Sequence, residues 1–167
     1  MEPAEMLGTA SQIAITMAGF AGVVVVFGRN TVHEWSAIDK FRLRLLLGTS
    51  TSALALCLIG LALLSAQLDP RAVWQWCSCV VIAAFAYSTA SSLRTYLRFR
   101  AEDLKASGAR PWIFYATSSA GIAATALQVY NILVPQGFWP FFVAIVLALL
   151  VSTLQFTRMI LAPHDTP

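Results

Sequence analysis

Charged residues are scarce along this chain. Asp, Glu, Lys and Arg together make up 11% of its 167 residues, whereas a soluble domain carries about 25%. Hydrophobic residues reach 58%, and the mean hydropathy is +0.71. Such a chain lacks the polar side chains that would cover a water-exposed surface. We therefore predict an integral membrane protein with little mass outside the bilayer.

Charge is missing above all from five apolar segments. Each has about 20 residues, the length that an α-helix needs to cross a hydrocarbon core of about 30 Å. The single formal charge within them is Arg158, in the last turn of the fifth segment, where its long side chain can reach the headgroups. The alternating pattern of a β-barrel is also missing, so we expect helices that form one transmembrane domain over residues 1–167. The segments are Thr9 to Gly28, Leu45 to Ala66, Val73 to Leu93, Trp112 to Val134 and Trp139 to Leu161.

Basic residues are nearly missing from alternate connections. The N-terminal tail and the turn from Pro135 to Phe138 have none, and the loop around Asp69 has only Arg71. The other ten of the 11 lysines and arginines lie in the two remaining loops and at the C-terminal end. Because cytoplasmic loops are the basic ones, we predict an all-α bundle of five transmembrane helices, with the N-terminus out and the C-terminus in.

The same asymmetry bears on partners. The net charge of +3 is expected to attract anionic lipid at the cytoplasmic face of the bilayer. Nucleic acid is not an expected partner, because no basic domain stands clear of the membrane.

Two helices are predicted to continue beyond the bilayer. Ser36 is a good N-cap and Asp39 can complete a capping box, so the second helix should begin near Ala37. Good helix formers follow the third segment up to Ser107, and Pro111 suits the start of the next helix.

Two amides interrupt the fourth segment, in the stretch "TALQVYNILV". The stretch continues a series that recurs near the helical period and should form one stripe: Thr117, Gly121, Ala124 or Thr125, Gln128 and Asn131. Small residues let membrane helices approach closely, and amides hydrogen-bond across the contact. This pattern favours helix packing; the alternative is a polar lining for a ligand or an ion path.

The first segment carries a run of small residues. Ala14, Ala18 and Gly22 follow a small-xxx-small pattern, with Gly19 beside them. The pattern is typical of close helix contact, either within one chain or between copies.

Residues that carry chemistry are rare. The chain has two histidines, and the first cytoplasmic loop holds His33 with Glu34, Trp35 and Asp39. This group could be a catalytic or metal cluster, but exposed loop charges and a helix cap explain it more simply. We therefore expect no catalytic residue, no cofactor and no metal. Membrane-embedded haem held by two histidines is excluded, because both histidines lie outside the segments.

The three cysteines, Cys57, Cys77 and Cys79, all lie in apolar segments. Cys77 and Cys79 point about 200° apart on a helix and should not bridge. Buried free cysteines behave as small hydrophobes, and a disulfide from Cys57 to one of the other two stays open.

Three blocks resemble a widespread group of small multi-span bacterial inner-membrane proteins with no assigned function. They are "IAITMAGFAGVVVVFG", "WSAIDKFRLRLLL", and "LQVYNIL" followed by "FWPFFVAIVLALLVSTLQFTRMI". The quoted blocks cover roughly a third of the chain. It implies a bacterial cytoplasmic membrane and contributes no chemistry.

Three classes of function compete. An enzyme needs a positioned acid, base, nucleophile or metal, and no segment contains Asp, Glu, Lys or His. A coupled transporter usually has ionisable groups and internal repeats, and neither is visible. We expect a non-catalytic membrane module that packs against itself or a membrane-protein partner. The alternative is an oligomeric channel or small-solute transporter.

Overall fold

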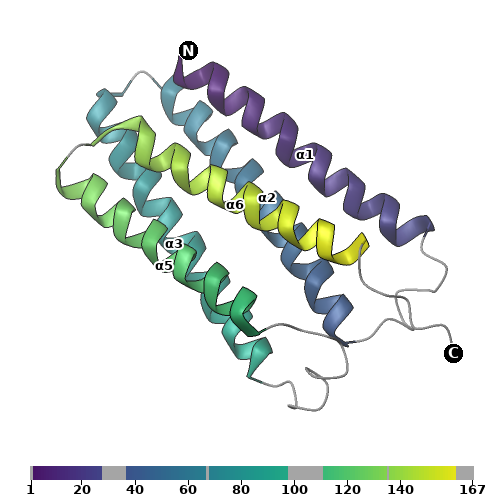
Figure 1. Cartoon of the computed structure of the whole chain (residues 1–167). Helices are drawn as coiled ribbons and strands as arrows, with labels where there is room; N and C mark the ends of the chain where they lie inside the picture. The colour runs from purple at the N-terminus through teal and green to yellow at the C-terminus, as the bar shows by residue number, and fades with distance from the viewer. Residues whose placement is uncertain (1, 28–36, 67, 98–110, 135, 161–167) are drawn as a thin grey trace, which may run out of the picture.

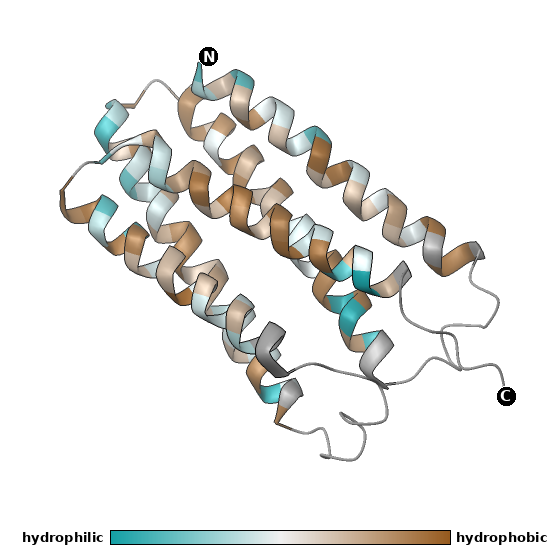
Figure 2. Cartoon of the chain, in the orientation of Figure 1, coloured by the Kyte–Doolittle hydropathy of each residue, from teal (hydrophilic) through white to brown (hydrophobic). Residues whose placement is uncertain are grey.

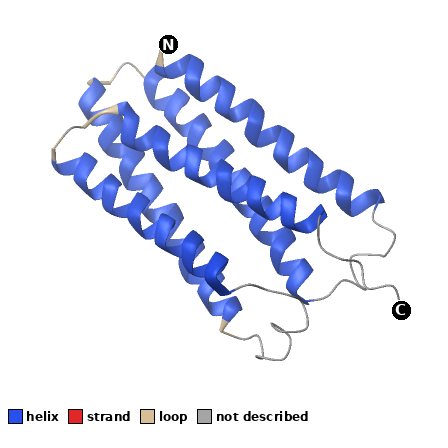
Figure 3. Cartoon of the chain, viewed as in Figure 1, coloured by secondary structure: helices blue, strands red, loops and turns tan. Residues whose placement is uncertain are grey.

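Helices account for nearly all of the chain that the structure describes. The computed structural model describes residues 2–27, 37–66, 68–97, 111–134 and 136–160, and this part contains no strand (Figure 3). The all-α prediction is therefore confirmed. The helices are α1 (Pro3–Phe27), α2 (Ala37–Ser65), α3 (Pro70–Tyr96), α5 (Pro111–Leu133) and α6 (Phe138–Ile160).

The helix starts follow local capping chemistry. The second and fourth predicted helices begin at Ala37 and Pro111, as expected. At the start of α3, the Asp69 side chain accepts a hydrogen bond of 2.9 Å from the Arg71 backbone N–H, and proline occupies the first turn. The predicted cap at Ser36 and the continuation of α3 over 98–107 lie outside the described residues.

The chain runs up and down through the bundle (Figure 1). The start of α1 and the α2–α3 and α5–α6 connections lie at one end. The start of α2, the end of α3 and the end of α6 lie at the other, which we call the basic end. Figure 2 shows hydrophilic residues gathered where α2 begins and α6 ends. The described basic residues at the basic end are Lys40, Arg42, Arg44, Arg94 and Arg158, against Arg71 at the opposite end.

The main core lies where α1, α2, α3 and α6 meet. Large side chains such as Leu56 and Ile145 fill it beside small ones such as Ala14. Gly60 on α2 makes the closest approach: a Cβ atom there would lie 2.9 Å from Leu7 Cδ1 and 3.1 Å from Phe141 Cε1. This glycine therefore lets α1 and α6 press directly onto the backbone of α2.

Four helices in the described part of the chain are long and apolar enough to cross a membrane. They are Pro3–Val23, Lys40–Ser65, Pro70–Thr95 and Phe138–Met159. The helix outside this set is α5, which carries two amides and several hydroxyls. Whether α5 could also cross a membrane depends on where its polar side chains lie.

Candidate functional site

Gln128 and Asn131, the two amides of α5, are fully buried. Both reach Ser78 on α3, which is also buried. The Ser78 hydroxyl donates to Gln128 Oε1 at 3.0 Å and accepts from Asn131 Nδ2 at 2.8 Å. Gln128 Nε2 donates to the Pro140 carbonyl of α6 at 2.6 Å. One serine and two amides thus connect three helices, and we call these three residues the amide network.

Asn131 also shapes the turn between α5 and α6. Its Oδ1 accepts from the Gly137 N–H at 2.9 Å, and its Nδ2 donates to the Gly137 carbonyl at 3.1 Å. Its backbone carbonyl accepts from the Gln136 N–H at 2.9 Å. Gln136 has a φ of 46°, in the left-handed region that glycine usually occupies. The asparagine bonds therefore offset the conformational cost of a tight turn.

The amide network is closed within a single chain. The side-chain oxygen and nitrogen of each amide have a protein partner. A buried polar group without a partner costs roughly 1–3 kcal/mol, so these bonds make the two amides tolerable inside an apolar bundle. This arrangement holds helices together and leaves neither amide facing an open path.

Elsewhere in the predicted α5 stripe, Ala124 is buried, and burial decreases toward the basic end. Gly121 and Thr117, which lie nearer the basic end, are half-buried. A Cβ atom at Gly121 would meet nothing within 4 Å. Only the part of the stripe near the α5–α6 turn packs tightly inside the chain.

The small residues of α1 divide between two faces. Ala14 is fully buried and belongs to the core, whereas Ala18 is half-buried. Gly19 and Gly22 are exposed, and a Cβ atom at either would meet nothing within 4 Å. The buried line on α1 continues from Ala14 to Ala21 instead. The glycines therefore belong to an outward face that no other part of the described chain covers.

A second buried polar contact joins α2 to α6. The hydroxyls of Ser50 and Ser152 are hydrogen-bonded to each other, and the Leu46 carbonyl lies 2.8 Å from the Ser50 hydroxyl and 3.3 Å from the Ser152 hydroxyl. Because each hydroxyl has a single proton, one serine donates to the other and the second donates to this carbonyl. One turn further, Gln155 is 3% exposed, and its Oε1 has no hydrogen-bond partner in the described structure. We did not predict these residues from the sequence. The combination of Ser152 and Gln155 at a spacing of three on an apolar helix was the available signal.

Two basic side chains lie beyond this contact, at the basic end. Arg42 of α2 is 8% exposed and Arg158 of α6 is half-buried. Their charges are close enough to repel each other. We predicted that the Arg158 side chain reaches the headgroups; in the structure it is half-buried in the last turn of α6.

The predicted loop candidates cannot be placed. His33, Glu34 and Trp35 lie outside the described residues; Asp39 lies in α2, but its side chain is not described. The described residues contain no group of three or more His, Cys, Asp or Glu side chains able to hold a metal ion. Cys57 and Cys77 are buried, Cys79 is exposed, and all three are free thiols.

No protein-family model, curated protein or solved structure matches this chain.

Proposed function

We propose that the chain is an integral protein of a bacterial cytoplasmic membrane, crossing it five times with the N-terminus outside. Four helices have the required length and apolarity. The case for α5 rests on where its polar groups lie: both amides are buried and hydrogen-bonded, while Ile122, Val129 and Leu133 are exposed. The two amides lower the mean hydropathy of α5. Because they are buried inside the bundle, lipid would contact the apolar side chains of this helix.

The orientation is proposed from charge. Five described basic residues lie at the basic end and one at the other. Lysine and arginine near the ends of spans favour the cytoplasmic side. The basic end therefore faces the cytoplasm.

Single-cysteine labelling tests the orientation. On a background without Cys57, Cys77 and Cys79, we expect Glu2→Cys to react with a membrane-impermeant maleimide in intact bacterial cells, and Lys105→Cys to react only after permeabilisation. Equal labelling of both in detergent is the control for reactivity. Protection of position 2, or labelling of position 105 from outside, would contradict the proposed topology.

Within this membrane placement, we propose a non-catalytic interaction module that packs against a second copy or a membrane-protein partner. One observation carries the proposal: the outward face of α1 is apolar and has a gap at Gly19 and Gly22, which we call the notch. Ile15 and Val26 are 55% and 75% exposed, and between them Gly19 and Gly22 leave open space. Residues 15, 19, 22 and 26 follow the helical period, so they form one stripe. In lipid, such a notch allows another helix to approach closely.

The alternative is an oligomeric channel or small-solute transporter. It would use amides and hydroxyls to line a path, but the amide network is already closed within the chain. A catalytic role would need an acid, base or nucleophile positioned in the bundle. An interaction module requires neither a polar path nor a catalytic group, so the arrangement of these helices supports the module best.

We expect Gly19→Leu with Gly22→Leu to reduce association about tenfold, because filling the notch removes roughly 1.4 kcal/mol of close contact. The measurement is the associated fraction of purified protein in mild detergent, together with membrane proteins that co-purify. Gly121→Leu is the matched control, since it also adds a side chain in open space but lies on α5, away from this face of α1. Unchanged association in the double variant would contradict the use of this face. Selective flux of ions or small solutes through liposomes containing only the wild-type protein would favour the channel instead.

A further inference from the structure

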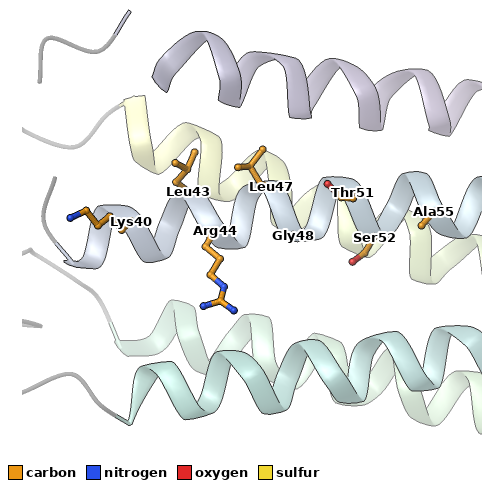
Figure 4. A pocket seen from close by; sticks show the side chains of 8 residues that line it. All are labelled: Lys40, Leu43, Arg44, Leu47, Gly48, Thr51, Ser52 and Ala55. Atoms are coloured by element: carbon orange, nitrogen blue, oxygen red, sulfur yellow. The ribbon is translucent and has the colours of Figure 1, made fainter. Parts of the chain in front are cut away.

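A hollow runs along one face of α2 at the basic end (Figure 4). Its volume is about 660 Å³, within the range of small-molecule sites in proteins. All of its described lining residues belong to α2, and they follow the helical period. Lys40 and Arg44 lie at its basic end, Gly48 lies midway, and Ala55 lies at its far end.

The glycine makes the hollow deeper. A Cβ atom at Gly48 would meet nothing within 4 Å, so none of the described helices occupies the space beside it. Thr51 and Ala55 continue the exposed small-residue surface one and two turns further. The opposite face of α2, with Leu46 and Leu56, is buried in the bundle. The hollow is therefore an unfilled strip along a helix that is otherwise well packed.

We propose that this hollow binds one anionic phospholipid of the cytoplasmic leaflet. The inference rests on the proposed membrane placement and deepens it by assigning a lipid site. Lys40 and Arg44 would hold the phosphate, since both are exposed cations at the basic end, and arginine is a good donor to phosphate oxygens. An acyl chain would lie along Leu47, Gly48 and Ala55.

Length supports this occupant. From Arg44 to Ala55 the helix rises by about 16 Å. One leaflet of a bilayer contributes half of a hydrocarbon core of about 30 Å. A lipid whose phosphate contacts the basic pair would therefore extend its chain to the far end of the hollow. A free anion would use only the basic end and leave the apolar remainder empty.

The test is native mass spectrometry of the full chain, extracted in mild detergent from liposomes with equal phosphatidylglycerol and phosphatidylcholine of the same chain length. We expect wild-type protein to retain phosphatidylglycerol preferentially. A basic residue at the membrane surface contributes about fivefold to binding of anionic lipid. Arg44→Gln should therefore lower retention about fivefold, and Lys40→Gln with Arg44→Gln about 25-fold. Arg94→Gln is the charge-matched control: Arg94 is exposed at the same end of the bundle, but it lies on α3 and does not line the hollow, so retention should change less than twofold.

Gly48→Leu tests the acyl-chain half of the site. The leucine enters open space, so the variant should fold normally and retain much less phosphatidylglycerol. Gly8→Leu should retain it fully. Equal retention by wild type, the Lys40/Arg44 double variant and Gly48→Leu would overturn the lipid site while leaving the topology, tested by cysteine labelling, unaffected. A change of oligomeric state in Gly48→Leu without a change in lipid retention would also overturn it and assign the hollow to a helix of another copy.

Discussion

Replacing Gln128 and Asn131 together by leucine is expected to lower the free energy of unfolding by about 3–5 kcal/mol. Hydrogen bonds between membrane helices contribute on average about 0.6 kcal/mol and at most about 1.7 kcal/mol each. The larger part of the loss comes from the groups left behind. Ser78 would lose both amide partners, and the Gly137 N–H would lose its acceptor. Such a group costs roughly 1–3 kcal/mol when it is fully buried, as Ser78 is, and less when it is half-buried, as Gly137 is.

The measurement is reversible unfolding of the purified protein in detergent, followed by circular dichroism. Gln12→Leu is the matched control, because Gln12 is an exposed amide on α1; its free energy of unfolding should change by less than about 0.5 kcal/mol. Asn131→Leu alone should account for more than half of the loss, since Asn131 also holds the α5–α6 turn. If the double variant kept its stability and oligomeric state but lost a transport activity, the amides would have to be assigned to a pore.

Gly60→Leu is expected to destabilise the bundle by about 3 kcal/mol. Extra atoms in a packed core typically cost about 1–3 kcal/mol and sometimes more. At Gly60 the first added carbon already meets Leu7 and the Phe141 ring at 2.9 and 3.1 Å, and a leucine adds three more. Higher helix propensity returns only about 1 kcal/mol. The cost of overpacking therefore exceeds the gain in helix propensity, and the variant should be less stable than wild type.

Gly60→Ala should reduce stability much less. The nearest atom to its Cβ is the movable end of the Leu7 side chain, and the gain in helix propensity then offsets the cost of this close contact. Gly8→Leu is the control, since it places the same side chain in open space. Thermal unfolding of the three variants in detergent makes the comparison. Equal stability of Gly60→Leu and Gly8→Leu would contradict the close packing of α1 and α6 on α2.

The helices of this protein were predictable from its sequence for local reasons. Long apolar segments and the proline at position 111 place the helices, and the starts at Ala37 and Pro111 agree with prediction. The separation of basic residues between the two ends also follows from sequence, because successive helices reverse direction. Both properties depend on neighbouring residues or on simple alternation, so they need no knowledge of which helices touch.

The candidate sites were predictable only in part. The sequence identified Gln128 and Asn131 as polar residues on one helix face, but their shared partner Ser78 lies 50 and 53 residues away. Gly60 and the hollow along α2 carried no comparable signal, and the spacing of Ser152 and Gln155 marked one side of the Ser50–Ser152 contact without identifying its partner. In a chain this apolar, core-facing and outward-facing positions have similar side chains, so helical periodicity gives little contrast between them.

The sequence by itself determined that this chain forms long apolar helices, where two of them begin, and that one end of the bundle is basic. Only the tertiary structure decided which faces meet. It separated Ala14 from Gly19 and Gly22, placing the alanine in the core and the glycines outside. It also paired the amides of α5 within the chain. The physical reason is that helix formation depends on local hydrogen bonds and hydrophobicity, whereas contact between helices depends on shape and polar pairing among residues far apart in sequence.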